Sequence, residues 1–131
     1  MVGRRSRLIA LAAALASAVG GPGLAAPAGV DPAIGCYFDA LGKDAKALAG
    51  CFAPDGFIVD VSRRIEGRDA IERWAAREVI GGTLDLLAVE ARPDGQRLLV
   101  HWAPKGSAGW RAWYAFVVRD GRILSADLQY A

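Results

Sequence analysis

FAPDGFIVDVSRRIEGRDAIERW, residues 52–74, contains more structural signals than any other stretch of this chain. Pro54-Asp55-Gly56 predicts a turn, because proline fixes φ and glycine reaches positive φ. Residues 57–61 are rich in β-branched and aromatic side chains, which predicts a buried strand. Asp60 places a carboxylate inside this strand. A buried charge costs free energy unless it is paired, protonated or directed at a polar cavity, so Asp60 is a candidate functional residue.

The first 28 residues have the pattern of a signal peptide. Residues 4–7 contain three arginines, residues 8–19 form an apolar run, and residues 23–28 offer the small side chains of a cleavage site. We therefore expect an exported protein, secreted or periplasmic, and the paired arginines leave the twin-arginine route open. The alternative is an uncleaved membrane helix. Gly-Gly-Pro at residues 20–22 disfavours it, because the apolar run then falls short of the roughly 20 residues that a span needs.

Removal of this leader changes the charge balance. The whole chain has 16 basic and 14 acidic residues, and without the three leader arginines 13 basic and 14 acidic residues remain, a net charge of −1. A charge this small indicates neither nucleic acid nor an anionic membrane surface as a partner. Residues 29–131 are sufficient for one domain with a modest core. After signal removal we expect no association with a membrane.

Cys36 and Cys51 lie at nearly equal distances from a turn predicted near residues 42–43, between helices predicted at residues 31–41 and 45–52. An αα-hairpin would bring two such positions face to face, as a disulfide requires. Disulfides persist in exported proteins, so we expect this bridge, worth about 3 kcal/mol for a loop of about 15 residues. Two buried free thiols, or a lipid-attachment signal ending at Cys36, are the alternatives.

The rest of the sequence predicts a hairpin, a third helix and a β-meander. The pattern predicts a turn at residues 62–64, a return strand at residues 65–66 and a helix at residues 68–79. Four strands are predicted at residues 83–91, 97–102, 109–119 and 122–130. On the last strand, alternation assigns one face to Leu124, Ala126, Leu128 and Tyr130. On the strand before it both faces carry aromatic residues, so alternation leaves its inner face open.

Three motifs, FDAL at residues 38–41, LAGCFAPDGFIVDV at residues 48–61 and IEGRDAIERW at residues 65–74, resemble the nuclear transport factor 2-like superfamily. Within it the chain is similar to the SnoaL-like polyketide cyclase and ketosteroid isomerase branches. The resemblance covers nearly all of residues 29–131. It implies an α+β cone in which three N-terminal helices pack on a curved, mostly antiparallel sheet, with a small apolar ligand in the open end. This fold hosts many activities, so it does not by itself define the reaction.

The resemblance implies catalytic roles for two residues. Asp60 matches the general base of the ketosteroid isomerases, and Tyr37 matches their oxyanion-stabilising tyrosine. A carboxylate in an apolar pocket can move a proton next to a carbonyl group, and a tyrosine hydroxyl can donate to the enolate oxygen. The isomerases carry a further acid on a late strand, where this chain has Tyr114 and no carboxylate. The alternative for Asp60 is a polar residue that only forms hydrogen bonds at the pocket mouth.

His101 is the only histidine of the chain and a third catalytic candidate, in a dyad with Asp60 or Asp127. The alternative is a structural or exposed histidine. We predict that Tyr114 and Asp127 contact the ligand, together with Trp74 and Trp102. One histidine with scattered acids does not form a metal site, and no motif indicates a cofactor.

Two functions from different classes remain. The first is a SnoaL-like enzyme that performs proton transfer, isomerisation or cyclisation on a small hydrophobic carbonyl compound. The second is a non-catalytic module that binds a small ligand or assembles with partners. For either function we expect a homodimer that associates through its sheet. A single cavity shared by Tyr37, Asp60 and His101 would favour the enzyme.

Overall fold

The computed structural model describes residues 28–131. The predicted signal peptide lies outside the described residues except for its last position. The described residues form nine elements, in chain order α1 (Pro32–Leu41), α2 (Ala45–Gly50), β1 (Phe52–Asp60), β2 (Arg63–Glu66), α3 (Arg68–Glu78), β3 (Thr83–Arg92), β4 (Gly95–Ala103), β5 (Trp110–Arg119) and β6 (Arg122–Tyr130). Between residues 28 and 131, no helix has the length and apolarity to cross a membrane.

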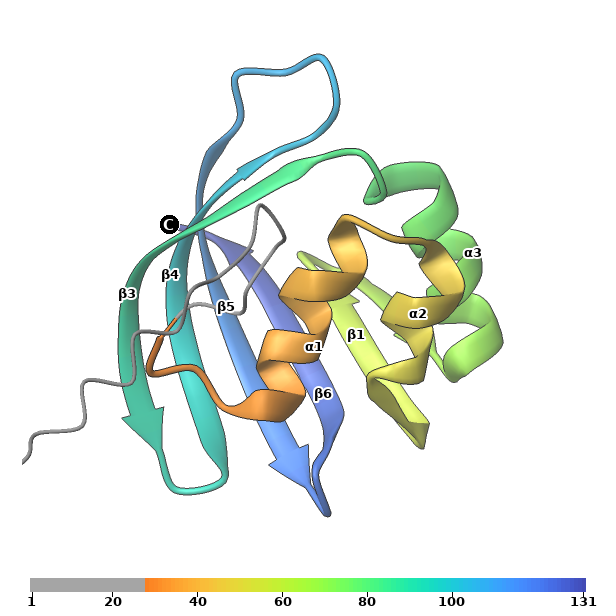
Figure 1. The fold of residues 1–131 in the computed structure, drawn as a ribbon, viewed down its shortest axis with the longest axis vertical. Helices are drawn as coiled ribbons and strands as arrows, with labels where there is room; N and C mark the ends of the chain where they lie inside the picture. Colours follow the sequence, from red (N-terminus) through yellow and green to blue (C-terminus); the bar gives the residue numbers. More distant parts are fainter. Residues whose placement is uncertain (1–27) are drawn as a thin grey trace, which may run out of the picture.

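The six strands form one mixed sheet in the order β2-β1-β6-β5-β4-β3. Neighbouring strands run antiparallel except β1 and β6, which are parallel. Figure 1 shows α1 crossing β5 and β6 of the twisted sheet, with α2 and α3 beside β1. The resemblance implied three N-terminal helices. Only α1 and α2 precede the sheet, because α3 follows the β1–β2 hairpin in the chain.

The predicted helix starts are confirmed by their caps. The Asp31 carboxylate accepts a hydrogen bond of 2.8 Å from the backbone N–H of Ala33, and Pro32 occupies the first turn of α1. The Asp44 carboxylate accepts one of 2.7 Å from the N–H of Ala47 in α2. The apolar stripe of α1 is buried, with Ile34, Tyr37, Phe38 and Leu41 in the core.

The predicted disulfide joins Cys36 of α1 to Cys51 at the end of α2, with 5.7 Å between their Cα atoms. The two helices pack against each other as the expected hairpin, which brings the two cysteines together. The bridge fixes α1 against the start of β1. Residue 37, which follows Cys36, is therefore held in a defined position against the sheet.

Two predictions from local pattern are wrong, and β-bulges are the reason for both. Pro54-Asp55-Gly56 is not a turn but part of β1: Phe52 pairs with Ile123 and Phe57 with Ser125, so four residues of β1 face one residue of β6. A residue in a bulge need not donate a backbone hydrogen bond to the partner strand. Proline, which has no N–H, is therefore accepted at position 54. A second bulge in β6 shifts its alternation, so that Ile123 rather than Leu124 is fully buried.

The inner face of β5, which alternation left open, carries Ala112, Tyr114 and Phe116, all buried. These side chains contact the same core as α1. Tyr130 at the end of β6 is 63% exposed and does not join that core. The sheet therefore has a filled end near Phe116 and an open end near Tyr130.

Candidate functional site

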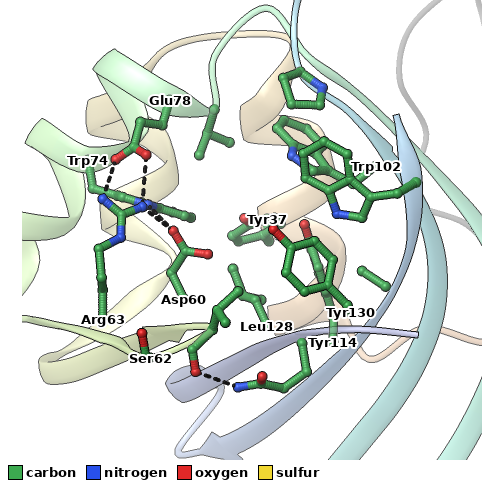
Figure 2. Close-up of a pocket in the computed structure, with 16 residues that line it drawn as sticks. Tyr37, Asp60, Ser62, Arg63, Trp74, Glu78, Trp102, Tyr114, Leu128 and Tyr130 are labelled. Carbon is green, nitrogen blue, oxygen red and sulfur yellow. Dashed lines mark hydrogen bonds and ion pairs between the residues drawn. The ribbon is translucent and has the colours of Figure 1, made fainter. Parts of the chain in front are cut away.

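The open end of the sheet contains a cavity of about 410 Å³, within the range of small-molecule sites. Its wall comes from α1, the β1–β2 turn, the end of α3 and the strands β4, β5 and β6. Figure 2 shows that the lining combines two kinds of side chain. It contains the aromatic residues Tyr37, Trp74, Trp102, Trp110, Tyr114 and Tyr130, and the charged residues Asp60, Arg63 and Glu78.

Strand alternation explains why the aromatic residues meet. Trp110 and Tyr114 lie on one face of β5, and Trp102 occupies the same face of the neighbouring strand β4. Opposite them, α1 contributes Tyr37. Its ring packs edge-to-face against Phe116 and Tyr114, with centroid distances of 5.6 and 6.4 Å. The inner wall of the cavity is therefore held rigidly by core packing.

Asp60 is the last residue of β1, at the rim of the cavity rather than in the middle of the strand. A two-residue turn, Val61-Ser62, follows it, because Asp60 pairs with Arg63 across the hairpin. Val61 has φ 59° in this turn. The turn is held to β6 by a 2.9 Å hydrogen bond from the Val61 N–H to the Leu128 carbonyl. The hairpin thus places the Asp60 side chain at a fixed point of the rim.

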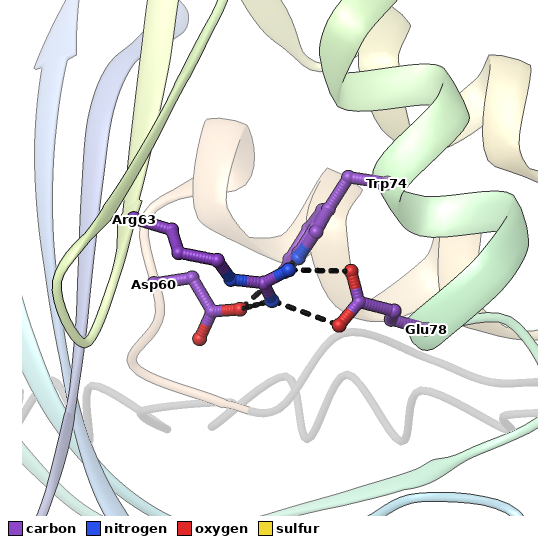
Figure 3. Close-up of polar contacts among 4 residues, drawn as sticks. All are labelled: Asp60, Arg63, Trp74 and Glu78. Atoms are coloured by element: carbon purple, nitrogen blue, oxygen red, sulfur yellow. Dashed lines mark hydrogen bonds and ion pairs between the residues drawn. The ribbon is translucent and has the colours of Figure 1, made fainter.

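The Asp60 carboxylate accepts hydrogen bonds from two neighbours, Arg63 and Trp74, in a network that Arg63 extends to Glu78 (Figure 3). Its Oδ2 accepts hydrogen bonds from the Arg63 guanidinium and, at 3.2 Å, from the Trp74 indole N–H. Arg63 also donates to both Glu78 oxygens, at 2.8 and 3.1 Å. Asp60 Oδ1 has no hydrogen-bond partner within residues 28–131. This network accounts for the charge in the strand and leaves one oxygen available to a ligand.

Two tyrosine hydroxyls face this carboxylate across the cavity. Burial raises the pKa of Tyr37 well above its usual value, and the neighbouring Tyr114 and Asp60 raise it further. Burial, with a contribution from Asp60, also raises the pKa of Tyr114. Both hydroxyls are therefore protonated donors at neutral pH. In the described part of the chain neither hydroxyl has a hydrogen-bond partner, and neither oxygen is among the fully buried unsatisfied atoms, so both remain open to the cavity.

Arg63 is a permanent cation at this site. Its hydrogen bonds to Glu78 and then to Asp60 raise the pKa of its guanidinium, which is already charged at neutral pH. The Arg63 side chain is 55% exposed, so solvent screens these ion pairs, and each contributes at most about 1 kcal/mol to stability. The role of the network is therefore to fix the geometry of Asp60 more than to stabilise the fold.

The structure brings five of the predicted site residues to this cavity: Tyr37, Asp60, Trp74, Trp102 and Tyr114. It places the other two elsewhere. His101 lies between the inward-facing Val100 and Trp102 on β4, so its side chain is on the opposite face of the sheet. Asp127 on β6 faces away from the cavity in the same manner, between two buried neighbours. The predicted dyads of His101 with Asp60 or Asp127 therefore have no basis at this cavity.

Sequence reasoning missed Arg63 and Glu78. Arg63 lies in the turn predicted at residues 62–64 and Glu78 in the helix predicted at residues 68–79, and the sequence pattern assigns neither residue to the site. One signal was available: a two-residue turn after Asp60 places residue 63 directly opposite it across the hairpin. No cluster of three or more His, Cys, Asp or Glu side chains that could hold a metal ion occurs among residues 28–131.

Comparison with known proteins gives similarity at the level of structure. No model of a known protein family matches the chain. No curated protein sequence matches it either. Among solved structures, a proposed polyketide cyclase from Sinorhizobium meliloti is 26% identical, with a TM-score of 0.65 over 74% of this chain and 93% of that one.

Two further solved structures have the same architecture at lower identity. A protein from Catenulispora acidiphila with a ketosteroid isomerase-like fold, solved in complex with trimethylamine, is 20% identical, with a TM-score of 0.68 over 78% of this chain and 87% of that one. A protein of unknown function from Cytophaga hutchinsonii, described as similar to nuclear transport factor 2, is 11% identical, with a TM-score of 0.66 over 76% of this chain and 87% of that one. At these identities the likeness is one of fold.

Proposed function

We propose that this chain, a member of the nuclear transport factor 2-like superfamily, binds a small, mostly apolar carbonyl compound in this cavity. The protein then transfers a proton from one carbon of that compound to another. One observation carries the proposal. A carboxylate with an unpartnered oxygen, Asp60, and two unpartnered tyrosine hydroxyls, Tyr37 and Tyr114, line the same aromatic cavity. These are the groups that isomerisation or cyclisation next to a carbonyl requires.

The proposed chemistry assigns a role to each group. The carbonyl oxygen of the ligand accepts hydrogen bonds from Tyr37 and Tyr114, which remain protonated because burial raises the pKa of both. Asp60 Oδ1 removes a proton from the carbon next to the carbonyl, and the electrons of that C–H bond form the enolate. The tyrosine hydroxyls stabilise the enolate oxygen. Return of the same proton to a different carbon completes an isomerisation with no other reactant.

A second candidate function is ligand binding without turnover. The ion pair between Arg63 and Asp60 favours it, because the carboxylate is already committed to a guanidinium on one oxygen. In this case Asp60 and the tyrosines would only orient the ligand. The structure from Catenulispora acidiphila, solved with trimethylamine, supports a small-molecule ligand for either function.

The test compares binding with turnover for a panel of β,γ-unsaturated cyclic ketones of one to four rings. Binding is followed by tryptophan fluorescence, since three tryptophans line the cavity. Turnover is followed by the ultraviolet absorbance of the conjugated product. We expect Asp60→Asn to bind the ketone with similar affinity and to lose turnover by at least about a hundredfold, the scale of general-base catalysis. Trp74 can still donate to the amide oxygen, so the fold is retained.

Asp55→Asn is the matched control, because Asp55 lies on the same strand and pairs with Arg119 outside the cavity. We expect it to leave turnover unchanged. If Asp60→Asn turns the ketone over like the wild type, Asp60 is not the base. Wild-type binding without turnover supports the non-catalytic function, and the absence of binding for the whole panel contradicts both.

We also propose export and a homodimer. The basic and apolar leader supports export, as does the Cys36–Cys51 disulfide, since such bridges persist in oxidising compartments. The face of the sheet away from the helices carries partly exposed apolar residues, among them Leu99, Trp113 and Val117, which supports association through the sheet. Size-exclusion chromatography with light scattering measures the dimer directly.

A further inference from the structure

The lining of the cavity has an excess of negative charge. Asp60 and Glu78 share one cation, Arg63, so the formal charge of the three side chains is −1. The nearby Lys105 packs its side chain beside Gly81 and does not line the cavity. Helix α3 ends at Glu78 and directs the negative end of its dipole to the same rim. A ligand that enters therefore meets a site that attracts positive charge.

The aromatic wall also suits a cation. Three tryptophans, Trp74, Trp102 and Trp110, line the cavity together with three tyrosines, and Figure 2 shows Trp74 and Trp102 among them. The faces of such rings carry partial negative charge and attract a cation, tryptophan most strongly, and cages of aromatic rings are the usual binding sites of quaternary ammonium groups. Charge and ring chemistry thus point to the same class of ligand.

Two of these rings are held in place before a ligand arrives. The Trp74 indole N–H donates to Asp60 Oδ2 at 3.2 Å, which fixes its plane beside the carboxylate. The Trp102 ring lies so close to Gly82 that a Cβ there would be 2.2 Å from its Cη2 atom. Preorganised rings lose little conformational freedom on binding, so more of the interaction energy appears as affinity.

We propose that the preferred ligand is an organic cation, a tertiary or quaternary ammonium group attached to an apolar body. The ammonium group lies against the faces of Trp74 and Trp102, at the rim that carries Asp60 and Glu78, and leaves Asp60 Oδ1 to the carbonyl part of the ligand. The apolar body extends past Trp110 and Tyr130, which are 39% and 63% exposed at the mouth. This inference rests on the proposed small-molecule function and adds the charge class of the molecule.

The test uses a pair of probes of equal shape, benzyltrimethylammonium and its uncharged isostere neopentylbenzene. Both are titrated into the protein without its predicted signal peptide, residues 1–28, and binding is followed by tryptophan fluorescence at low salt. We expect the cation to bind about tenfold more tightly, the scale of a partly desolvated cation–π contact. The preference should decrease as salt is added, because part of it is electrostatic.

Two charge-removing variants, Asp60→Asn and Glu78→Gln, each bring the formal charge of the lining to zero. Both should reduce the preference for the cation several-fold and leave the affinity of neopentylbenzene unchanged. The matched control is Glu72→Gln, the same change on the same helix at a residue that does not line the cavity. It should behave as the wild type.

Equal or tighter binding of neopentylbenzene overturns the inference and leaves the small-molecule function standing. A preference for the cation that persists in both variants also overturns it, since the charge would then come from elsewhere. If neither probe binds, the inference fails, and the ketone panel described above decides separately whether the cavity binds small molecules at all.

Discussion

Gly82→Ala is expected to displace Trp102 and to damage the cavity without a change in any polar group. A Cβ at position 82 would lie 2.2 Å from Trp102 Cη2, 2.7 Å from its Cζ3 and 2.9 Å from the Ala103 carbonyl oxygen. Ordinary van der Waals contact begins near 3.4 Å. The indole must therefore move by about 1 Å or more, and the nearby carbonyl belongs to β4, which is held in the sheet by both of its neighbours.

Overpacking of this kind costs about 1–3 kcal/mol of unfolding free energy. Urea denaturation measures this loss, and the fluorescence of the native state reports the changed environment of Trp102. We expect weaker binding of benzyltrimethylammonium in the variant, because one aromatic face leaves its position in the wall.

The matched control is Gly50→Ala at the end of α2, where a Cβ meets no atom within 4 Å. Alanine is the better helix former, so this variant should be as stable as the wild type or more stable by up to about 1 kcal/mol. If Gly82→Ala has the stability and probe affinity of the wild type, the close packing of Gly82 against Trp102 does not hold the wall.

Three further predictions concern the disulfide between α1 and the end of α2 and the two tyrosines at the inner end of the cavity. Reduction of the Cys36–Cys51 bridge should lower the unfolding free energy by about 3 kcal/mol, because it closes a loop with a sequence separation of 15; urea titrations with and without reductant measure this. Tyr37→Phe should weaken a ketone ligand about fivefold and leave the melting temperature nearly unchanged, because the lost hydroxyl opens into the cavity, has no partner among the described residues and would bond only the ligand. Burial raises the pKa of Tyr37 and Tyr114, so the folded protein keeps protons that the unfolded chain releases near pH 10. The free energy of unfolding should therefore fall as pH rises above about 10. An ultraviolet titration should show both tyrosines ionising only when the protein unfolds.

Local signals predicted the helices and the disulfide well. Asp31-Pro32 and Asp44 begin their helices through caps that involve only neighbours in the chain. The Cys36–Cys51 bridge follows from a short hairpin of helices, another local feature. Such elements depend on contacts within a few residues, which a sequence shows directly.

Bulges limited the prediction of the strands. Pro54-Asp55-Gly56 has the composition of a turn, yet the parallel pairing of β1 with β6 holds it inside a strand. Leu124 follows a regular alternation, yet an extra residue in β6 turns Ile123 inward. The first outcome depends on a partner strand more than 60 residues away, so no window of sequence contains its cause. The second depends on the register of the neighbouring strand β5, which regular alternation does not show.

The sequence by itself determined where the first two helices begin, the disulfide pair, the family resemblance and the candidacy of Asp60, Tyr37 and Tyr114, because each rests on local chemistry or on a motif. Only the tertiary structure decided which side chains share a cavity. Strand alternation turned His101 and Asp127 to the other face, and the hairpin turn brought Arg63 to Asp60 and Glu78. Side chains share a site when they point into the same cavity, and the pairing of the strands sets where each of them points.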